Sequence, residues 1–301
     1  MSRVMLTGAS GFIGRRVLTR LQAQATPCLA IGRTPGTDDS WHALDLFDHD
    51  AVTAFMATHR PTHLIHLAWN TEHGKFWHAE DNIAWLHATV HLLKAFSDHG
   101  GLRAVVAGTC AEYDWAHGHC VEEVTPCRPR SLYGEAKHAA HRLARQLLAG
   151  SDTALVWARI FFPVGPGEPA GRFIPSVVDA MLTGQPVRCS HGRQYRDFMA
   201  ADDVAHALCH LLDTSADGAI NVGSGEPIRL SHIVERLAAL TGWTGEAHFG
   251  ALPVPDDDPP LLVADTRRLQ ATGWHGGTPL DAVLEDIIDW RRQVLAASQR
   301  S

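Results

Sequence analysis

Residues 3–14 read RVMLTGASGFIG, an apolar run of strand character that meets a glycine-rich turn and then a helix-period segment over residues 12–23. Glycines at this spacing allow a tight turn and a close approach of the backbone to a pyrophosphate, whose charge then faces the positive end of the helix dipole. A strand before the glycines and a helix after them predict a dinucleotide site. The turn residues expected at the cofactor are Gly8, Ser10, Gly11, Phe12, Ile13 and Gly14.

Outward from this stretch, short β-branched runs alternate with helix-period segments, which predicts an α/β fold with a doubly wound parallel sheet of the Rossmann type. The expected strands are residues 3–7, 28–31, 63–67, 103–107 and 154–158. The expected helices are residues 12–23, a segment between an N-cap at Asp48 and Pro61, residues 80–98 and residues 133–148. A chain of 301 residues with 45% hydrophobic content can bury such a core together with a smaller appended domain.

The alternation breaks down after residue 158, where several prolines and glycines follow, and it resumes at residues 202–212 and 219–222. We therefore expect a dinucleotide-binding domain over residues 1–162, with a return segment at 198–222. A smaller substrate-binding domain, C-terminal for the most part, is expected over residues 163–197 and 223–301. Ligand should lie between the two, at the ends of the strands.

Composition excludes several classes of function. The net charge is −7 and no segment concentrates Lys and Arg, so a nucleic-acid partner is not expected. Six cysteines without a Cys-x-x-Cys pair, and a start that leads straight into a strand, favour a reduced, cytoplasmic protein. No apolar run is long enough to cross a bilayer, so no membrane partner is expected. His117, His119 and Cys120 are close in sequence, but their spacing alone does not make a zinc site, and no metal is predicted.

The end of the second strand distinguishes NADP from NAD. An acidic residue there would accept hydrogen bonds from an NAD ribose, but this chain has Arg33. A guanidinium suits a 2′-phosphate because its planar donors bind the phosphate oxygens bidentately. NADP(H) is therefore favoured over NAD(H), which stays possible. Asp45, followed by Leu46, is a candidate acceptor for the adenine amine.

The second chemical signal is Tyr133 and Lys137, four residues apart on a predicted helix, which places the phenol and the ammonium group on one face. The chain has only three Tyr and three Lys, so coincidence is improbable. Lowering a phenol pKa from about 10 to about 7 requires about 4 kcal/mol, and one cation about 4 Å away supplies on the order of that energy. Thr109, at a neighbouring strand end, is expected to hydrogen-bond the same carbonyl oxygen. Together they predict a hydride-transfer site.

These residues resemble the extended short-chain dehydrogenase/reductases that act on nucleotide sugars, and the resemblance covers nearly the whole chain. It is carried by the glycine turn, His66-Leu67-Ala68, Asn82, Thr109 four residues before Tyr113, and the Tyr133–Lys137 pair. Two later stretches add to it: Arg196-Asp197-Phe198 with Asp202-Asp203-Val204, and Asn221-Val222-Gly223-Ser224-Gly225. The resemblance implies that Thr109, Tyr133 and Lys137 are catalytic, and that Leu67, Ala68 and Asn82 lie at the cofactor. It also implies a homodimer formed through a four-helix interface.

For the substrate, the resemblance makes Arg196 the first candidate contact to a diphosphate and Arg172 the second. The alternative for each is an ordinary surface arginine. Trp69, directly after the third predicted strand, is expected to wall the pocket beside the nicotinamide, together with Thr109. The family's usual Asn after its Arg-x-x motif is replaced by Phe162, which changes the hydrogen bonding available to the sugar.

Departures from the family pattern narrow the reaction. Dehydratases follow the catalytic Thr with Asp and Glu, whereas this chain has Cys110 and Ala111, which disfavours elimination of water. Arg33 argues against permanently held NAD. The sequence therefore favours NADPH-dependent reduction of a keto group on a nucleotide sugar, with a 4-keto-6-deoxy sugar as the leading substrate. A nucleotide-sugar 4-epimerase is the enzyme alternative, and a dinucleotide-sensing regulatory protein is the alternative outside catalysis.

Overall fold

A computed structural model describes residues 3–34, 36, 40–254 and 258–298. Its larger lobe is built on a seven-stranded sheet in which every neighbouring pair runs parallel. The strands, in order across the sheet, are β11 (Gly218–Val222), β7 (Ala154–Ile160), β5 (Arg103–Thr109), β4 (His63–His66), β1 (Val4–Thr7), β2 (Cys28–Gly32) and β3 (Trp41–Ala43). The predicted Rossmann-type parallel sheet is confirmed.

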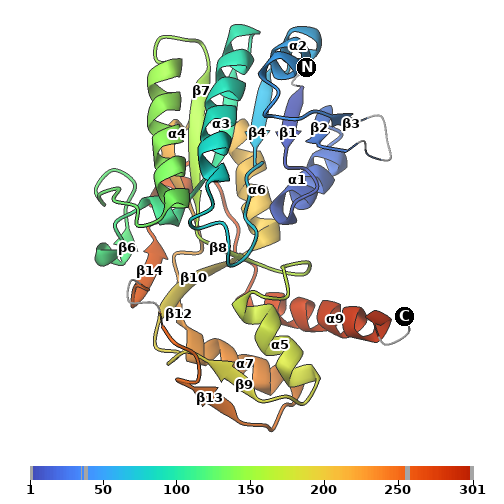
Figure 1. Cartoon of the computed structure of the whole chain (residues 1–301), viewed down its shortest axis with the longest axis vertical. Coiled ribbons are helices and arrows are strands. Elements are labelled where there is room, and N and C mark those ends of the chain that lie inside the picture. Colours follow the sequence, from blue (N-terminus) through green and yellow to red (C-terminus); the bar gives the residue numbers. More distant parts are fainter. Residues whose placement is uncertain (1–2, 35, 37–39, 255–257, 299–301) are drawn as a thin grey trace.

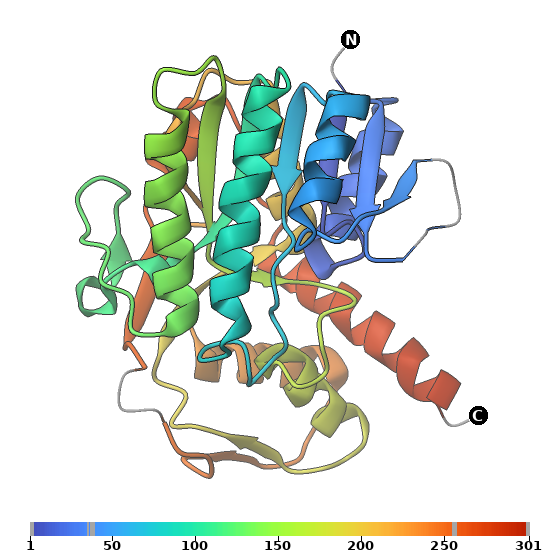
Figure 2. The same cartoon turned by 45° about the horizontal axis from the view of Figure 1, so that its top comes forward.

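Helices cover both faces of this sheet (Figure 1). One face is covered by α2 (His49–His59), α3 (Asp81–Asp98) and α4 (Leu132–Leu148), and the other by α1 (Phe12–Ala23) and α6 (Ala201–Leu212). Figure 2 shows α3 and α4 side by side along their face. The strands are apolar on both sides because each side meets a helix layer, and two separate hydrophobic cores result.

The smaller lobe holds a five-stranded sheet and a two-stranded sheet. The first contains β12 (Pro227–Arg229), β10 (Tyr195–Ala200), β14 (Leu261–Ala264) and β6 (His119–Cys120), with β8 (Phe162–Val164) also paired to β10. The second pairs β9 (Val187–Cys189) with β13 (Ala247–Phe249). Buried apolar side chains of α5 (Phe173–Leu182), α7 (Leu230–Thr241) and α9 (Leu280–Ser298) form its core, whereas α8 (Arg267–Ala271) packs back against β11.

The two later stretches that carry the family resemblance contain the buried polar residues Asp197 and Asn221, whose hydrogen bonds join neighbouring strands and turns. The Asp197 carboxylate accepts hydrogen bonds from the backbone of Ser224, Gly225 and Ala264, which fixes the turn after β11 against β14. A side chain at Gly223 would meet the Asp197 carboxylate at 2.7 Å, so glycine is needed there.

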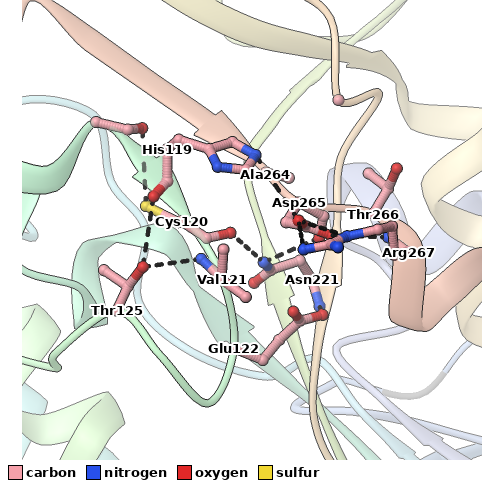
Figure 3. Close-up of polar contacts among 12 residues, drawn as sticks. His119, Cys120, Val121, Glu122, Thr125, Asn221, Ala264, Asp265, Thr266 and Arg267 are labelled. Atoms are coloured by element: carbon pink, nitrogen blue, oxygen red, sulfur yellow. Dashed lines mark hydrogen bonds and ion pairs between the residues drawn. The ribbon is translucent and has the colours of Figure 1, made fainter.

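Asn221 is the second of these residues and lies at the centre of Figure 3. Its amide nitrogen donates to the Cys120 carbonyl at 2.8 Å and to the Asp265 carbonyl at 3.2 Å. Its amide oxygen accepts from the Tyr113 hydroxyl at 2.7 Å, and its backbone nitrogen donates to Glu122. Asn221 therefore joins the end of β11 to β6, to β14 and to the segment that follows Thr109.

Most predicted elements of the larger lobe are confirmed within a few residues. The helix over residues 12–23 is found with the bounds predicted, and Asp48 caps α2 by accepting from the Ala51 backbone nitrogen at 2.9 Å. The edge strand β3 was not predicted, and neither were the short strands of the smaller lobe. Among the described residues, no helix is long and apolar enough to span a membrane.

Candidate active site

The glycine turn forms a narrow cradle at the carboxyl end of β1. Gly8 has a φ of +70°, and a Cβ there would lie 2.8 Å from the Ala68 backbone nitrogen. A Cβ at Gly14 would lie 2.0 Å from the Gly8 carbonyl oxygen, so α1 packs directly against the turn. No side chain caps the start of α1 at Gly11, which leaves backbone N–H groups at the helix N-terminus for an anion. The residues fit a dinucleotide pyrophosphate.

This close packing makes a strong prediction for Gly14→Ala. The added methyl group has to push α1 away from the Gly8 carbonyl, because a heavy-atom separation of 2.0 Å is a severe overlap. We expect the affinity for a nicotinamide dinucleotide to fall at least about tenfold, since the helix N-terminus and the turn would bind the pyrophosphate together. Isothermal titration with NADPH measures the change. If the variant had wild-type affinity and an unchanged melting temperature, the glycine turn would not be the pyrophosphate site.

The neighbouring strand end is held by Thr7 and His66. The Thr7 hydroxyl oxygen accepts from the backbone nitrogens of Leu67 and Ala68, and it lies 2.7 Å from His66 Nδ1. His66 Nε2 lies 2.9 Å from the Thr89 hydroxyl. Burial lowers the pKa of His66 to about 3, and the nearby Lys137 charge acts in the same direction. A neutral His66 therefore fixes the backbone of residues 67 and 68 against Gly8.

Arg33, Asp45 and Leu46 lie beyond the ends of β2 and β3. Arg33 is exposed directly after β2, and none of the described residues forms an ion pair with it. Asp45 is exposed and one of its oxygens accepts from the Phe47 backbone nitrogen at 3.0 Å, while Leu46 is buried. An exposed guanidinium at this edge is compatible with a phosphate on the adenosine ribose.

Thr109, Tyr133 and Lys137 come together between the ends of β5 and α4. Ser131 caps α4 by accepting from the Gly134 backbone nitrogen at 3.1 Å, which sets Tyr133 in the first turn and Lys137 one turn later. The Thr109 side chain lies near enough to Tyr133 to act on the pKa of its phenol. The Lys137 ammonium group donates to the Ala107 carbonyl at 2.7 Å. All three side chains are buried.

Burial controls the acidity of this group. It raises the pKa of Tyr133, against which the Thr109 side chain acts, and it lowers the pKa of Lys137 to about 7, against which Glu112 acts. The sequence predicts that Lys137 lowers the phenol pKa, but in the folded protein the pKa of Tyr133 is raised. The phenol stays protonated near neutral pH, which suits a proton donor better than a base.

Glu112 supports Thr109 and was missed at the sequence level. Its Oε1 accepts from the Thr109 backbone nitrogen at 2.9 Å and from the indole of Trp157 at 2.8 Å, and its Oε2 pairs with Arg159 at 3.1 Å. Glu112 is fully buried, and the Arg159 guanidinium also lies 4.5 Å from the Tyr113 ring centroid. In the sequence, the signal for this role was an acidic residue within the Thr109–Tyr113 stretch.

Aromatic rings enclose the Tyr133 side chain. Its ring centroid lies 4.9 Å from Phe76, 5.9 Å from Trp77 and 6.3 Å from Trp69, each in an edge-to-face arrangement. Phe76 and Trp77 come from the segment between β4 and α3, which also receives a hydrogen bond from the Tyr133 backbone nitrogen to the Trp77 carbonyl at 3.0 Å. The wall around the phenol is therefore apolar.

Asn82 supports this wall. Its side-chain amide nitrogen donates to backbone carbonyls and is therefore not available to a ligand. Its amide nitrogen donates to the carbonyls of Phe76 and Ala79, both at 2.8 Å, and its oxygen accepts from the Trp69 indole at 2.8 Å. The side chain is completely buried. Asn82, expected at the cofactor, thus holds Trp69 and the segment that carries Phe76.

The two candidate diphosphate ligands have different surroundings. Arg172, at the N-terminus of α5, is half-buried, and its charge acts on Tyr133, His73 and Glu168. Arg196 is buried, donates to the Pro259 carbonyl at 2.8 Å and pairs with Asp258 at 2.5 Å. A diphosphate would have to displace Asp258 from Arg196, whereas Arg172 forms no ion pair among the described residues.

Glu168 lies in the segment between β8 and α5 and was not singled out by the sequence. It is buried, and one of its carboxylate oxygens has no hydrogen-bond partner. Burial raises its pKa to about 7, opposed by the charges of Arg172 and Arg16 and by a Gly165 hydrogen bond. His117 and His119 are exposed, and no group of three or more His, Cys, Asp or Glu suited to a metal occurs in the described part of the chain.

Comparisons with known proteins agree with this geometry. Residues 4–223 match the model of the NAD dependent epimerase/dehydratase family. CDP-abequose synthase of Salmonella typhimurium strain LT2 is 25% identical, over 95% of this chain and 97% of its own. The dTDP-6-deoxy-L-talose 4-dehydrogenase (NAD(P)(+)) of Kitasatospora kifunensis is 29% identical, over 86% and 85%. The structure of MoeE5 in complex with UDP-glucose and NAD has a TM-score of 0.84 and 30% identity, covering 98% of this chain and all of that one.

Proposed function

The chain belongs to the NAD-dependent epimerase/dehydratase family of nucleotide-sugar enzymes, and from this premise we propose that it is an NADPH-dependent reductase of a 4-keto-6-deoxy nucleotide sugar. The observation that carries the proposal is the buried group of Thr109, Tyr133 and Lys137, in which the phenol is kept protonated. A protonated phenol is the acid that a carbonyl oxygen needs when its carbon is reduced.

The proposed mechanism assigns one task to each side chain. Bound NADPH would supply the hydride for the carbonyl carbon. Tyr133 gives its proton to the carbonyl oxygen, so that a hydroxyl group forms, and Thr109 orients that oxygen by hydrogen bonding. Lys137 stabilises the phenolate that Tyr133 leaves behind and binds the nicotinamide ribose, and Tyr133 then recovers a proton from solvent. The residues of the cradle, with Leu67 and Ala68 beside Gly8, would hold the cofactor.

The preference for a 6-deoxy sugar rests on the walls of the site. Trp69, Phe76 and Trp77 surround Tyr133 with apolar surface, which suits a methyl group better than a hydroxymethyl group. Cys110 and Ala111 supply no acid and base for elimination, and burial raises the pKa of the Cys110 thiol. The Kitasatospora relative is named for the 4-position of a 6-deoxy sugar. We place Trp69, Thr109, Arg172 and Arg196 at this substrate.

The preference for NADPH rests on Arg33, and it predicts a change of cofactor in Arg33→Ser. Removing the guanidinium should weaken NADPH binding about tenfold to a hundredfold, because a charge-assisted phosphate contact is lost, and should leave NADH binding unchanged. Fluorescence titration with each cofactor measures both affinities. Arg193→Ser, which removes another exposed arginine from the smaller lobe, is the control. Equal losses for both cofactors in Arg33→Ser would contradict the assignment.

We propose residues 1–162 with 198–222, which supply all seven strands of the parallel sheet, as the cofactor domain, and residues 163–197 and 223–301 as the substrate domain. We also propose a homodimer through α3 and α4, which expose Ile83 by 46% and Leu143 by 49% on adjacent helices. Sedimentation equilibrium tests the dimer at micromolar concentration.

Turnover tests the function directly. The protein is mixed with NADPH and a panel of 4-keto-6-deoxy nucleotide sugars, and loss of cofactor absorbance is compared with product formed. We expect one NADPH oxidised for each product molecule. NAD that co-purifies with the protein, together with sugar conversion without net oxidation of added cofactor, would replace the reductase with a 4-epimerase.

A further inference from the structure

Trp69 joins the two proposed catalytic groups. The Lys137 ammonium nitrogen lies 3.9 Å from the centroid of the Trp69 ring, and the same residue meets the Tyr133 ring edge-to-face at 6.3 Å. The indole nitrogen donates to the Asn82 amide oxygen at 2.8 Å, which fixes the plane of the ring. The ring is buried and also stacks near Trp85 at 6.2 Å. Trp69 therefore has a defined position directly beneath a buried cation.

Lys137 has few other groups that favour its charge. Lys137 is almost completely buried, and within the described part of the chain its ammonium group donates to one carbonyl, that of Ala107. From the elements packed around it, the titratable groups are Glu112 after β5, His66 on β4 and Tyr133 on α4 itself. Only Glu112 is negatively charged, and it is already engaged by Arg159. An aromatic face next to an otherwise weakly compensated ammonium group is the arrangement in which a cation–π contact is strongest.

We infer that Trp69 is a positioning residue for Lys137. The indole face of Trp69 holds the Lys137 ammonium group beside Tyr133 and keeps it protonated inside the buried site. Asn82 takes part by fixing the indole. The inference rests on the proposed function for its catalytic meaning, because the phenolate left by Tyr133 needs a charged Lys137 nearby. It assigns Trp69 a role beyond that of a pocket wall.

The test is a titration of Lys137 that does not depend on activity. The chain has three lysines, Lys75, Lys94 and Lys137, so protein labelled with ¹³C at lysine Cε gives three assignable signals. Lys75 and Lys94 are exposed and serve as internal references. The midpoint of the Lys137 signal is measured in the wild type, in Trp69→Leu, in Trp69→Phe and in Trp85→Leu. Trp85 belongs to the same aromatic cluster as Trp69, but its indole makes no cation–π contact with Lys137, so Trp85→Leu is the control.

We expect the Lys137 midpoint, near pH 7 in the wild type, to fall by roughly one pH unit in Trp69→Leu and by less in Trp69→Phe, because phenyl binds cations more weakly than indole. Trp85→Leu should leave it unchanged. In turnover assays the alkaline limb of the kcat/KM profile should move to lower pH by the same amount, since activity is lost as Lys137 loses its proton.

An unchanged or raised Lys137 midpoint in Trp69→Leu would overturn the inference, because it would mean that water or Glu112 sets the charge. If Trp69→Leu does not fold, Trp69→Phe, which keeps a ring of similar shape, decides the question by the same criterion. Absence of NADPH turnover in the wild type would refute the proposed function alone, while the titration would still decide whether the indole holds the ammonium group.

Discussion

Tyr133→Phe is expected to lower kcat for NADPH-dependent reduction by roughly a thousandfold, the size of effect that a positioned general acid provides. The substitution removes only the phenol hydroxyl, on whose pKa the Thr109 side chain acts. The ring contacts with Trp69, Phe76 and Trp77 stay, so the melting temperature and NADPH affinity should remain close to those of the wild type. Stopped-flow measurement of NADPH oxidation, with binding measured separately, distinguishes loss of chemistry from loss of cofactor.

Tyr195→Phe is the matched control for this substitution, since Tyr195 is exposed on β10 and its hydroxyl has no partner among the described residues. It should react at the wild-type rate. If Tyr133→Phe keeps more than a tenth of the wild-type kcat, the proton comes from another group, and the role given to Tyr133 is wrong.

Glu112→Ala is expected to lower the free energy of unfolding by about 3–5 kcal/mol, because it leaves the buried Arg159 without its carboxylate. The Trp157 indole and the Thr109 backbone nitrogen lose their acceptor at the same time. Urea unfolding followed by circular dichroism measures the change. Because Thr109 is held by this carboxylate, any variant that remains folded should also show a reduced kcat.

A surface carboxylate gives the comparison. Glu123 pairs with Arg268, but its side chain is 79% exposed, whereas that of Glu112 is fully buried. Glu123→Ala should therefore change the stability by less than about 1 kcal/mol. Similar losses for the two variants would show that burial of the Glu112–Arg159 pair has no special weight.

Local signals made the geometry of the glycine turn and of α4 predictable. The glycine turn, the helix over residues 12–23 and the Tyr133–Lys137 spacing all involve neighbours in sequence, whose geometry follows from the element in which they lie. Arg33 could be placed at the end of β2 for the same reason. Asn82 was selected by resemblance, but its partners Trp69 and Phe76 could be seen only in the fold.

Contacts between distant segments were not predictable from one sequence. Glu112 and Arg159 are 47 residues apart, and nothing in their local patterns indicates that β5 and β7 bring them together in the core. The strands of the smaller lobe have two to six residues and lie among prolines, so their periodicity is too short to recognise. The predicted effect of Lys137 on Tyr133 omitted burial, which dominates the phenol pKa in the folded chain.

The fate of the hydride shows whether NADPH reduces the sugar. NADPH carrying deuterium at the transferred position of the nicotinamide is incubated with the protein and a 4-keto-6-deoxy nucleotide sugar, and the product is examined by mass spectrometry and NMR. We expect one deuterium at C4 of the sugar for each NADPH consumed. Product without deuterium, or sugar conversion with the added NADPH intact, would contradict it.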